Sequence, residues 1–154
     1  MAHVELSLSE SFIPQPRTPT PPERIVDNLT RWVVAAVDAA EPCLVLDSER
    51  RVVAASDACR ALLGLAPATP LAGRFPLTDA VRLVDFTAAR GELAETEVAT
   101  IPPLLALSSG RLVRGLMRVR AAADGGHDVT LDAISTPVWD AGVVVGSLTF
   151  FAPV

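Results

Sequence analysis

The chain has 154 residues, of which 50% are hydrophobic and 20% charged, and its formal net charge is -5. This length suits one domain with an appendage, and the hydrophobic share supports a core without metal or disulfide staples. The acidic balance, without a basic cluster, argues against nucleic-acid binding. The apolar runs are too short to span a membrane and the N-terminus lacks a signal pattern, so a cytoplasmic protein without membrane contact is expected. All basic residues are arginine, as in many GC-rich bacterial genomes.

The first twenty residues show no hydrophobic period and are rich in proline, including Pro14, Pro16 and Pro19. This composition predicts a flexible or polyproline-like tail over residues 1–20. A proline-rich segment can also bind the aromatic groove of another domain, so that alternative stays open.

An amphipathic helix is predicted over residues 21–41. Thr20 can cap this helix, proline is tolerated in its first turn, and Pro42 ends it. Its apolar residues recur at three- and four-residue spacing, which is typical of one helix face. The stripe either packs on its own domain or contacts a second copy of the chain, and the two are not exclusive. The candidates for a dimer interface are Ile25, Leu29, Trp32, Val33 and Val37.

Residues 43–65 predict two strands followed by a helix. Apolar runs at residues 44–46 and 51–55 flank a polar turn, as in a β-hairpin. Ser56 is a good N-cap, because its hydroxyl can accept a hydrogen bond from the first helical turn. Gly64 suits the left-handed position that ends a helix.

The middle of the chain predicts short helices joined by loops. Residues 66–75 contain two prolines and a glycine and are expected to be a connection. A short helix is predicted over residues 78–86, and the three glutamates between residues 92 and 97 are expected to be a solvated face. Two prolines open a further helix over residues 102–109, which Gly110 closes.

Three strands are predicted at the C-terminal end, over residues 112–121, 127–138 and 143–151. The first two alternate between apolar and polar residues, which is typical of half-buried strands. The third is apolar more evenly, so we expect it to be central or covered on both faces. Turn residues at 124–126 and 140–142 join the three into an antiparallel meander.

A row of arginines projects from one face of the first of these strands: Arg114, Arg118 and Arg120. Asp132 on the next strand is placed to face them, which predicts cross-strand ion pairs. Contact with an anion or a partner protein is the alternative.

The sequence offers little for catalysis or metal binding. Cys43 and Cys59 fit two small buried residues, with a disulfide as the alternative. His3 lies in the predicted tail and His127 at a predicted turn, and the chain lacks both metal-ligand spacing and a phosphate-binding glycine loop. We therefore expect no catalytic residue and no metal site. A small α+β enzyme is the least favoured class, which a cleft centred on His127 would revive.

The order of these elements resembles a PAS domain over residues 41–151. PAS domains typically combine an apolar strand ending in Asp, a capped helix ending Leu-Leu-Gly, a later Gly-Arg, a Thr-Pro in the fourth strand and a Val-Gly in the fifth. The matching residues are Asp47, Leu62-Leu63-Gly64, Gly73-Arg74, Thr136-Pro137 and Val145-Gly146. Arg50 replaces the usual turn glycine, and Ser56 replaces the usual asparagine cap.

The resemblance implies an α+β fold: a PAS-like five-stranded antiparallel sheet with short helices on one face, forming a domain over residues 42–154 behind the amphipathic helix. It implies a non-catalytic regulatory module in bacterial signal transduction, which acts by homodimerisation or by contact with a signalling protein. The sequence ends without the segment that often leads to an output domain. We therefore expect a free-standing module whose output passes through another protein.

PAS domains that hold a cofactor bind it between the inner sheet face and the short helices. Haem members use an axial histidine on one of those helices, and flavin photoreceptors use a cysteine beyond the second helix, whereas Cys59 lies on the first. Neither haem nor flavin is expected. The alternative function is a sensor for a small apolar ligand, although the same residues would equally suit a filled core. The candidate pocket residues are Phe75, Leu83, Phe86, Leu104, Leu105, Met117, Leu131 and Phe150.

Overall fold

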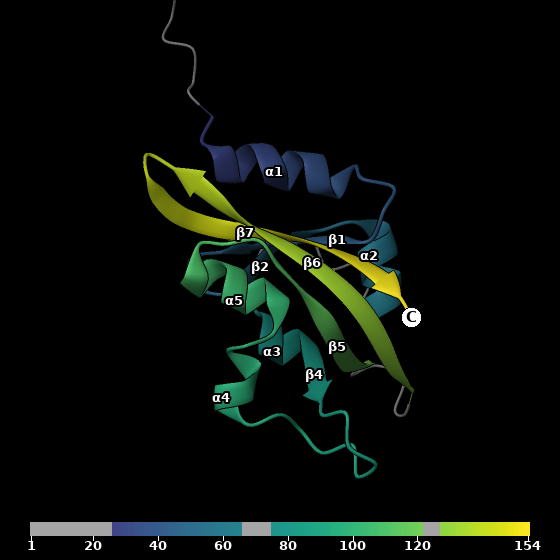
Figure 1. Ribbon diagram of the computed structural model, residues 1–154. Helices are drawn as coiled ribbons and strands as arrows, with labels where there is room; N and C mark the ends of the chain where they lie inside the picture. The colour runs from purple at the N-terminus through teal and green to yellow at the C-terminus, as the bar shows by residue number, and fades with distance from the viewer. Residues whose placement is uncertain (1–25, 66–74, 122–126) are drawn as a thin grey trace, which may run out of the picture.

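The computed structural model describes residues 26–65, 75–121 and 127–154. The predicted tail, Ile25, the Gly73-Arg74 pair and the turn at 124–126 lie outside the described residues. In chain order the elements are α1 (Asn28–Val37), β1 (Cys43–Asp47), β2 (Arg51–Ala55), α2 (Asp57–Leu63), β3 (Phe75–Pro76), α3 (Leu77–Ala80), β4 (Val81–Val84), α4 (Glu95–Val98), α5 (Pro102–Ser109), β5 (Val113–Ala121), β6 (Asp128–Asp140) and β7 (Val143–Pro153) (Figure 1).

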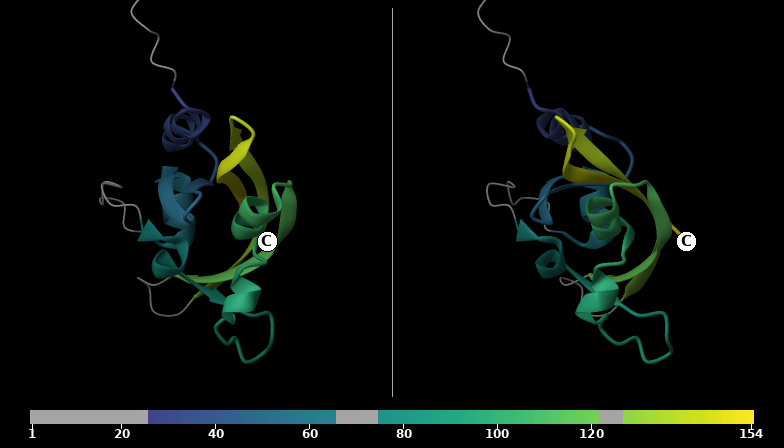
Figure 2. Two further views of the ribbon diagram at one scale, coloured as in Figure 1. Left: turned by 90° about the vertical axis from the view of Figure 1, so that its left-hand side faces the viewer. Right: turned by 60° about the vertical axis from the view of Figure 1, so that its left-hand side comes forward.

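The described strands form one antiparallel sheet in the order β3-β2-β1-β7-β6-β5-β4. β7 lies between β1 and β6, at the centre of the sheet, as its even apolar composition predicted. The sheet curls around α5, whereas α1 lies on the outer face (Figure 2). The sheet therefore has an inner face that holds the main core and an outer face that α1 covers in part.

The α+β class and the antiparallel sheet are confirmed, but the described part of the chain forms seven strands instead of five. The predicted helix over residues 78–86 is wrong, because α3 is a single turn and the chain continues as β4. Val81 and Leu83 are buried while Arg82 between them is exposed, a period of two. Along this stretch the backbone N–H and C=O groups form hydrogen bonds with β5, so they do not need the hydrogen bonds of a longer helix.

α1 is shorter than the predicted helix. It begins at Asn28 instead of near Pro21, because the Asp27 side chain accepts a hydrogen bond from the Thr30 amide at 2.7 Å. It ends at Val37, well before Pro42. The residues between are needed to turn the chain back into β1, where the Pro42 carbonyl accepts a hydrogen bond from β7 at 3.0 Å.

The segment of three glutamates also contains more structure than predicted. The Glu97 side chain accepts a hydrogen bond from the Ala94 amide at 3.1 Å, and Glu95–Val98 form the single helical turn α4. α5 agrees with its prediction, with prolines at its first two positions and Gly110 in the left-handed conformation at its end.

The β1–β2 turn is shaped by one buried carboxylate. The Asp47 Oδ1 atom accepts hydrogen bonds from the amides of Glu49 at 2.9 Å and Arg51 at 3.0 Å. Arg50 has φ 65°, in the left-handed region that favours glycine. This is the position at which PAS turns usually have glycine, so the chain pays a conformational cost there.

Ser56 links the entrance of β1 to the start of α2. Its Oγ atom accepts hydrogen bonds from the amides of Cys43 at 3.0 Å and Cys59 at 3.2 Å, and donates one to the Glu41 carbonyl at 2.7 Å. Gly64 ends α2 with φ 67°. Both predicted helix boundaries are therefore confirmed, and Ser56 also organises the strand beside the helix.

Two hydrophobic clusters lie on opposite faces of the sheet. The larger cluster fills the inner face and includes residues of α2, α3 and α5. The smaller cluster lies on the outer face under α1, and its buried members are Ala36, Cys43, Val45, Ala54, Val138 and Leu148. α1 therefore packs on its own sheet.

Candidate interaction surface

α1 covers only part of the outer sheet face. Leu29 and Val33 pack against the outer cluster, and Ala36 is buried within it. The Asn28 side-chain amide donates a hydrogen bond to the Trp139 carbonyl at 2.7 Å, which fixes the start of α1 to the β6–β7 hairpin. The contacts of α1 are with β1, β2, β7 and β6, so the outer surface towards β5 stays open to solvent.

The predicted dimer-interface residues divide between two environments. Leu29 and Val33 are half-buried against the sheet, whereas Trp32 is 45% and Val37 is 51% exposed. Helical geometry separates Trp32 from Val37 by about 140° around the helix axis, so they lie on different flanks of α1. Trp32 lies on the flank that faces Leu148 and Phe150 of β7.

Exposed apolar side chains continue from Trp32 across the outer face. Phe150 on β7 is 41% exposed and pairs with Ile134 on β6, which is 39% exposed. Leu116 on β5 is 55% exposed and lies diagonally from Ile134, with the Arg114–Asp132 ion pair on the other diagonal between them. We call these four residues, Trp32, Phe150, Ile134 and Leu116, the outer strip. Exposed apolar side chains that lie together in this way typically mark a protein contact.

The sequence analysis did not single out Ile134 or Leu116. The sequence pattern could have identified them, because both are large apolar residues at positions where these alternating strands otherwise carry solvent-facing polar residues. Phe150 was proposed for the inner pocket but lies on the outer face. Side chains alternate along a strand, and Phe151 takes the inner phase, where it is 5% exposed.

A small groove lies in the corner between α1 and β7. Its volume is about 170 Å³. Its lining is apolar apart from the end at Glu41, and consists of Trp32, Ala35, Ala36, Ala39, Glu41, Cys43, Leu148 and Phe150. We call it the corner groove. It adjoins the outer strip, because Trp32 and Phe150 belong to both.

Two arginines of the row form cross-strand ion pairs, and one of these is the predicted pair with Asp132. Arg114 donates two hydrogen bonds to Asp132, at 3.1 and 2.7 Å, which confirms the predicted pairing. Arg120 donates two to Asp128, at 2.7 and 3.2 Å. These hydrogen bonds hold the pKa of Asp132 and of Asp128 below the usual value and raise the pKa of each arginine.

Arg118, the third arginine of the row, holds a loop instead of a carboxylate. It donates a hydrogen bond to the Asp85 carbonyl at 3.1 Å, and its guanidinium lies 4.8 Å from the centre of the Phe86 ring. Phe86 was proposed for the inner pocket, but it is 52% exposed in this loop. The turn that follows β4 carries it away from the inner face.

Four of the proposed pocket residues pack together on the inner face: Leu83, Leu104, Met117 and Leu131 are all buried in the main cluster. Phe75 packs against that cluster, and Leu105 on α5 is half-buried. In the described part of the chain these side chains contact one another as a core.

α5 lies directly on the inner face of the sheet. A Cβ atom added at Gly115 would lie 3.3 Å from Cγ of Pro102, so the helix start and β5 are in close contact. The Ser147 hydroxyl donates a hydrogen bond to the Pro103 carbonyl at 3.0 Å and so ties the same turn to β7. At its other end, Gly110 lies under the Trp139 ring. Both ends of α5 are thus held against the sheet.

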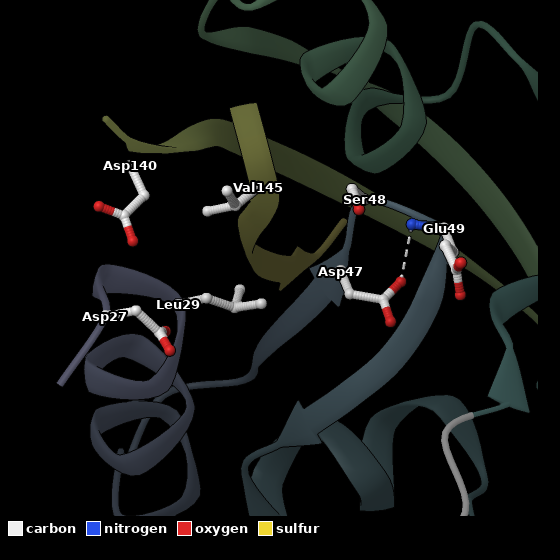
Figure 3. A pocket seen from close by; sticks show the side chains of 7 residues that line it. All are labelled: Asp27, Leu29, Asp47, Ser48, Glu49, Asp140 and Val145. Atoms are coloured by element: carbon white, nitrogen blue, oxygen red, sulfur yellow. Dashed lines mark hydrogen bonds between the residues drawn. The ribbon is translucent and has the colours of Figure 1, made fainter. Parts of the chain in front are cut away.

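A wider hollow, of about 450 Å³, lies where α1 meets the β1–β2 and β6–β7 turns (Figure 3). It is lined by Asp27, Leu29, Asp47, Ser48, Glu49, Asp140 and Val145. Asp27 caps α1 and Asp47 holds its own turn, so two of the four carboxylates already bind backbone amides. Within the described ranges, no three His, Cys, Asp or Glu side chains are arranged to hold a metal ion.

Cys43 and Cys59 are free, buried thiols, as predicted. Burial raises the pKa of the Cys59 thiol to about 12, and it raises the pKa of Cys43 as well. His127 is exposed at the start of β6. Among the helices that the structure describes, none has the length and apolar character needed to cross a membrane.

No protein-family model and no curated protein matches this sequence. Solved structures do match. A PAS domain from Colwellia psychrerythraea has a TM-score of 0.55 and 16% sequence identity, over 83% of this chain and 98% of that one. The PAS domain of nitrogen regulation protein NR(II) from Vibrio parahaemolyticus has a TM-score of 0.51 and 13% identity, over 79% and 96%. A LOV protein from Rhodobacter sphaeroides has a TM-score of 0.57 and 14% identity, over 79% of this chain but 64% of its own.

The chain therefore has the PAS fold. This agrees with the resemblance seen in the sequence motifs and with the strand order around β7. Identities of this size establish the fold alone, so the function has to be argued from the surface and the core.

Proposed function

We propose that the protein is a non-catalytic regulatory module with a PAS fold, which acts by forming a homodimer through α1 and the outer sheet face. The observation that carries the proposal is the outer strip together with the corner groove. Trp32, Phe150, Ile134 and Leu116 are each between 39% and 55% exposed and follow one another from α1 to β5. Burying this surface against another protein is favourable, because it removes apolar area from water.

The packing of the inner sheet face favours a function in protein–protein interaction over a function in ligand sensing. The inner residues named as pocket candidates lie in a packed cluster, and α5 touches β5 through Pro102 and Gly115. A ligand between α5 and β5 would have to separate that contact. For this reason a sensor for a small molecule is the less favoured, alternative function. Neither haem nor flavin is part of the proposal.

We place the dimer in the bacterial cytoplasm, in a pathway where a second signalling protein reads its state. The two free thiols fit a reducing compartment. Without a reactive cluster of its own in the described residues, the module would transmit a signal by changing which surfaces it buries.

The test is the dissociation constant of the dimer, measured by sedimentation velocity over a concentration series. We expect Phe150→Ser and Ile134→Ser each to raise it about tenfold or more, because central apolar contacts carry most of an interface's energy. Val143→Ser is the matched control, since Val143 is 62% exposed on the same strand but lies at the hairpin turn. A chain that stays monomeric at every concentration, or a control as damaging as Phe150→Ser, would overturn the proposal.

A further inference from the structure

We propose that the corner groove receives the Trp32 side chain of a second copy of this chain, in an antiparallel pairing of the two α1 helices. This inference rests on the proposed dimer and specifies how its two halves fit. It follows from the shape of the groove, from the arrangement of side chains along α1 and from the symmetry of a homodimer.

The groove has the size and chemistry of a site for one aromatic ring. Its volume is about 170 Å³, and a cavity of about 150 Å³ lined by apolar side chains holds a benzene molecule. Its walls are the alanines of α1 on one side and Leu148 and Phe150 on the other. The groove opens on the outer face, so a side chain can enter it from a neighbouring molecule.

Trp32 is placed to supply that ring. It is 45% exposed although it is one of the largest apolar side chains of the protein, and it lies at the edge of the groove. Ala35 and Ala39 follow it on the same flank of α1, at three- and four-residue spacing. Because alanine side chains are short, another helix can approach this flank closely.

The twofold symmetry of a homodimer decides the direction of the pairing. An isologous contact occurs twice, so whatever enters the groove must come from the same face that carries the groove. If two α1 helices lie antiparallel about Ala35, Trp32 of each copy comes level with Asp38 of the other, one residue from Ala39, where the groove lies. A parallel pairing would place each Trp32 beside its equivalent and leave both grooves open.

The charges that border this flank fit the same pairing. Arg31 and Asp38 are exposed and lie two helical turns apart on the solvent side of α1. In the antiparallel arrangement each Arg31 comes within one residue of the level of Asp38 in the other copy, which brings opposite charges together. In the parallel arrangement like charges would face each other, which is unfavourable.

The fluorescence of Trp32 tests the inference. Trp139→Phe leaves Trp32 as the sole tryptophan, since the chain contains two. As the concentration rises and the dimer forms, we expect its emission to shift to shorter wavelength and its quenching by acrylamide to fall several-fold. Val37→Ser in the same Trp139→Phe background is the control, because Val37 lies on another flank of α1 and its change should leave the shift and the quenching of Trp32 as they were.

Charge exchange tests the direction of the helices. Arg31→Asp and Asp38→Arg should each weaken the dimer, and the protein that carries both changes should recover most of its affinity. Val37→Ser, about 140° around α1 from Trp32 and 51% exposed, should leave the dimer unchanged.

Sedimentation of the same samples separates this inference from the proposed function. Two results would each show that Trp32 does not enter the groove of the other copy. One is a dimer in which Trp32 stays equally accessible to acrylamide. The other is a protein with both Arg31→Asp and Asp38→Arg that dimerises more weakly than either single variant. The dimer itself would then stand with another contact. If no dimer forms at any concentration, both proposals are wrong.

Discussion

The Cδ1 atom of Leu29 lies 2.6 Å from the point that a Cβ atom at residue 146 would occupy, and the residue there is Gly146. Gly146 is buried on β7, where it pairs with Asp47 of β1. A Cβ at this position would also strike the Leu46 carbonyl oxygen. The absence of a side chain at Gly146 is therefore what lets α1 lie directly on the sheet.

Gly146→Ala tests this contact. We expect it to lower the free energy of unfolding by about 1–3 kcal/mol, because the added methyl group has to displace Leu29 or separate β1 from β7. Urea unfolding followed by circular dichroism measures the change.

Gly91→Ala is the control. Its Cβ would lie 3.2 Å from the end of the exposed Asp85 side chain, which can move, so a change below about 1 kcal/mol is expected. Equal losses for the two variants would show that Gly146 has no special role.

Arg50 offers a change in the opposite direction. Its φ of 65° is costly for a residue with a Cβ atom, and its side chain is exposed. Arg50→Gly should therefore raise the free energy of unfolding by about 1 kcal/mol. Thermal unfolding measures the shift, and a lower melting temperature would contradict this account of the turn.

Much of the fold could be predicted from the sequence because its signals are local. The Asp47 turn, the Ser56 cap, and the glycines that end α2 and α5 each depend on neighbouring residues. The alternation of β5 and β6 likewise gave their two faces correctly. These patterns in sequence order were sufficient to indicate the PAS fold.

The errors arise where distant residues decide the structure. β4 reads as a helix until its pairing with β5 is known. Phe150 and Phe151 are adjacent in sequence and face opposite sides of the sheet, so choosing between them required the position of α1. The corner groove could not be predicted, because α1 and β7 form it together and lie at opposite ends of the chain.

The two thiols should be protected in the folded protein. Cys59 is fully buried with its pKa raised to about 12, and Cys43 is 1% exposed, so little reactive thiolate is available near neutral pH. We expect iodoacetamide at pH 8 to label neither cysteine in the native protein and both in denaturant, as read by intact mass. Rapid labelling of the native protein would contradict the packing described for α2 and β1.

Stability should decrease in acid. The pKa values of Asp128 and Asp132 are lowered by hydrogen bonds from arginine, and that of Asp85 by a hydrogen bond from Thr87. A lowered pKa in the folded state stabilises it above about pH 4 and loses this effect as the pH falls through the folded-state value. The melting temperature should therefore fall below about pH 4. Asp128→Asn should make that decrease shallower, and an unchanged decrease would contradict the role of its pair with Arg120.

The central claim is that the open part of the outer face is an interface between two copies of this chain. Sedimentation equilibrium of the unmodified protein, from about 1 µM to about 100 µM, tests it most directly. The account predicts a reversible rise in mass from one chain to two across this range, and Phe150→Ser shifts the rise to higher concentration. A mass of one chain throughout would contradict it.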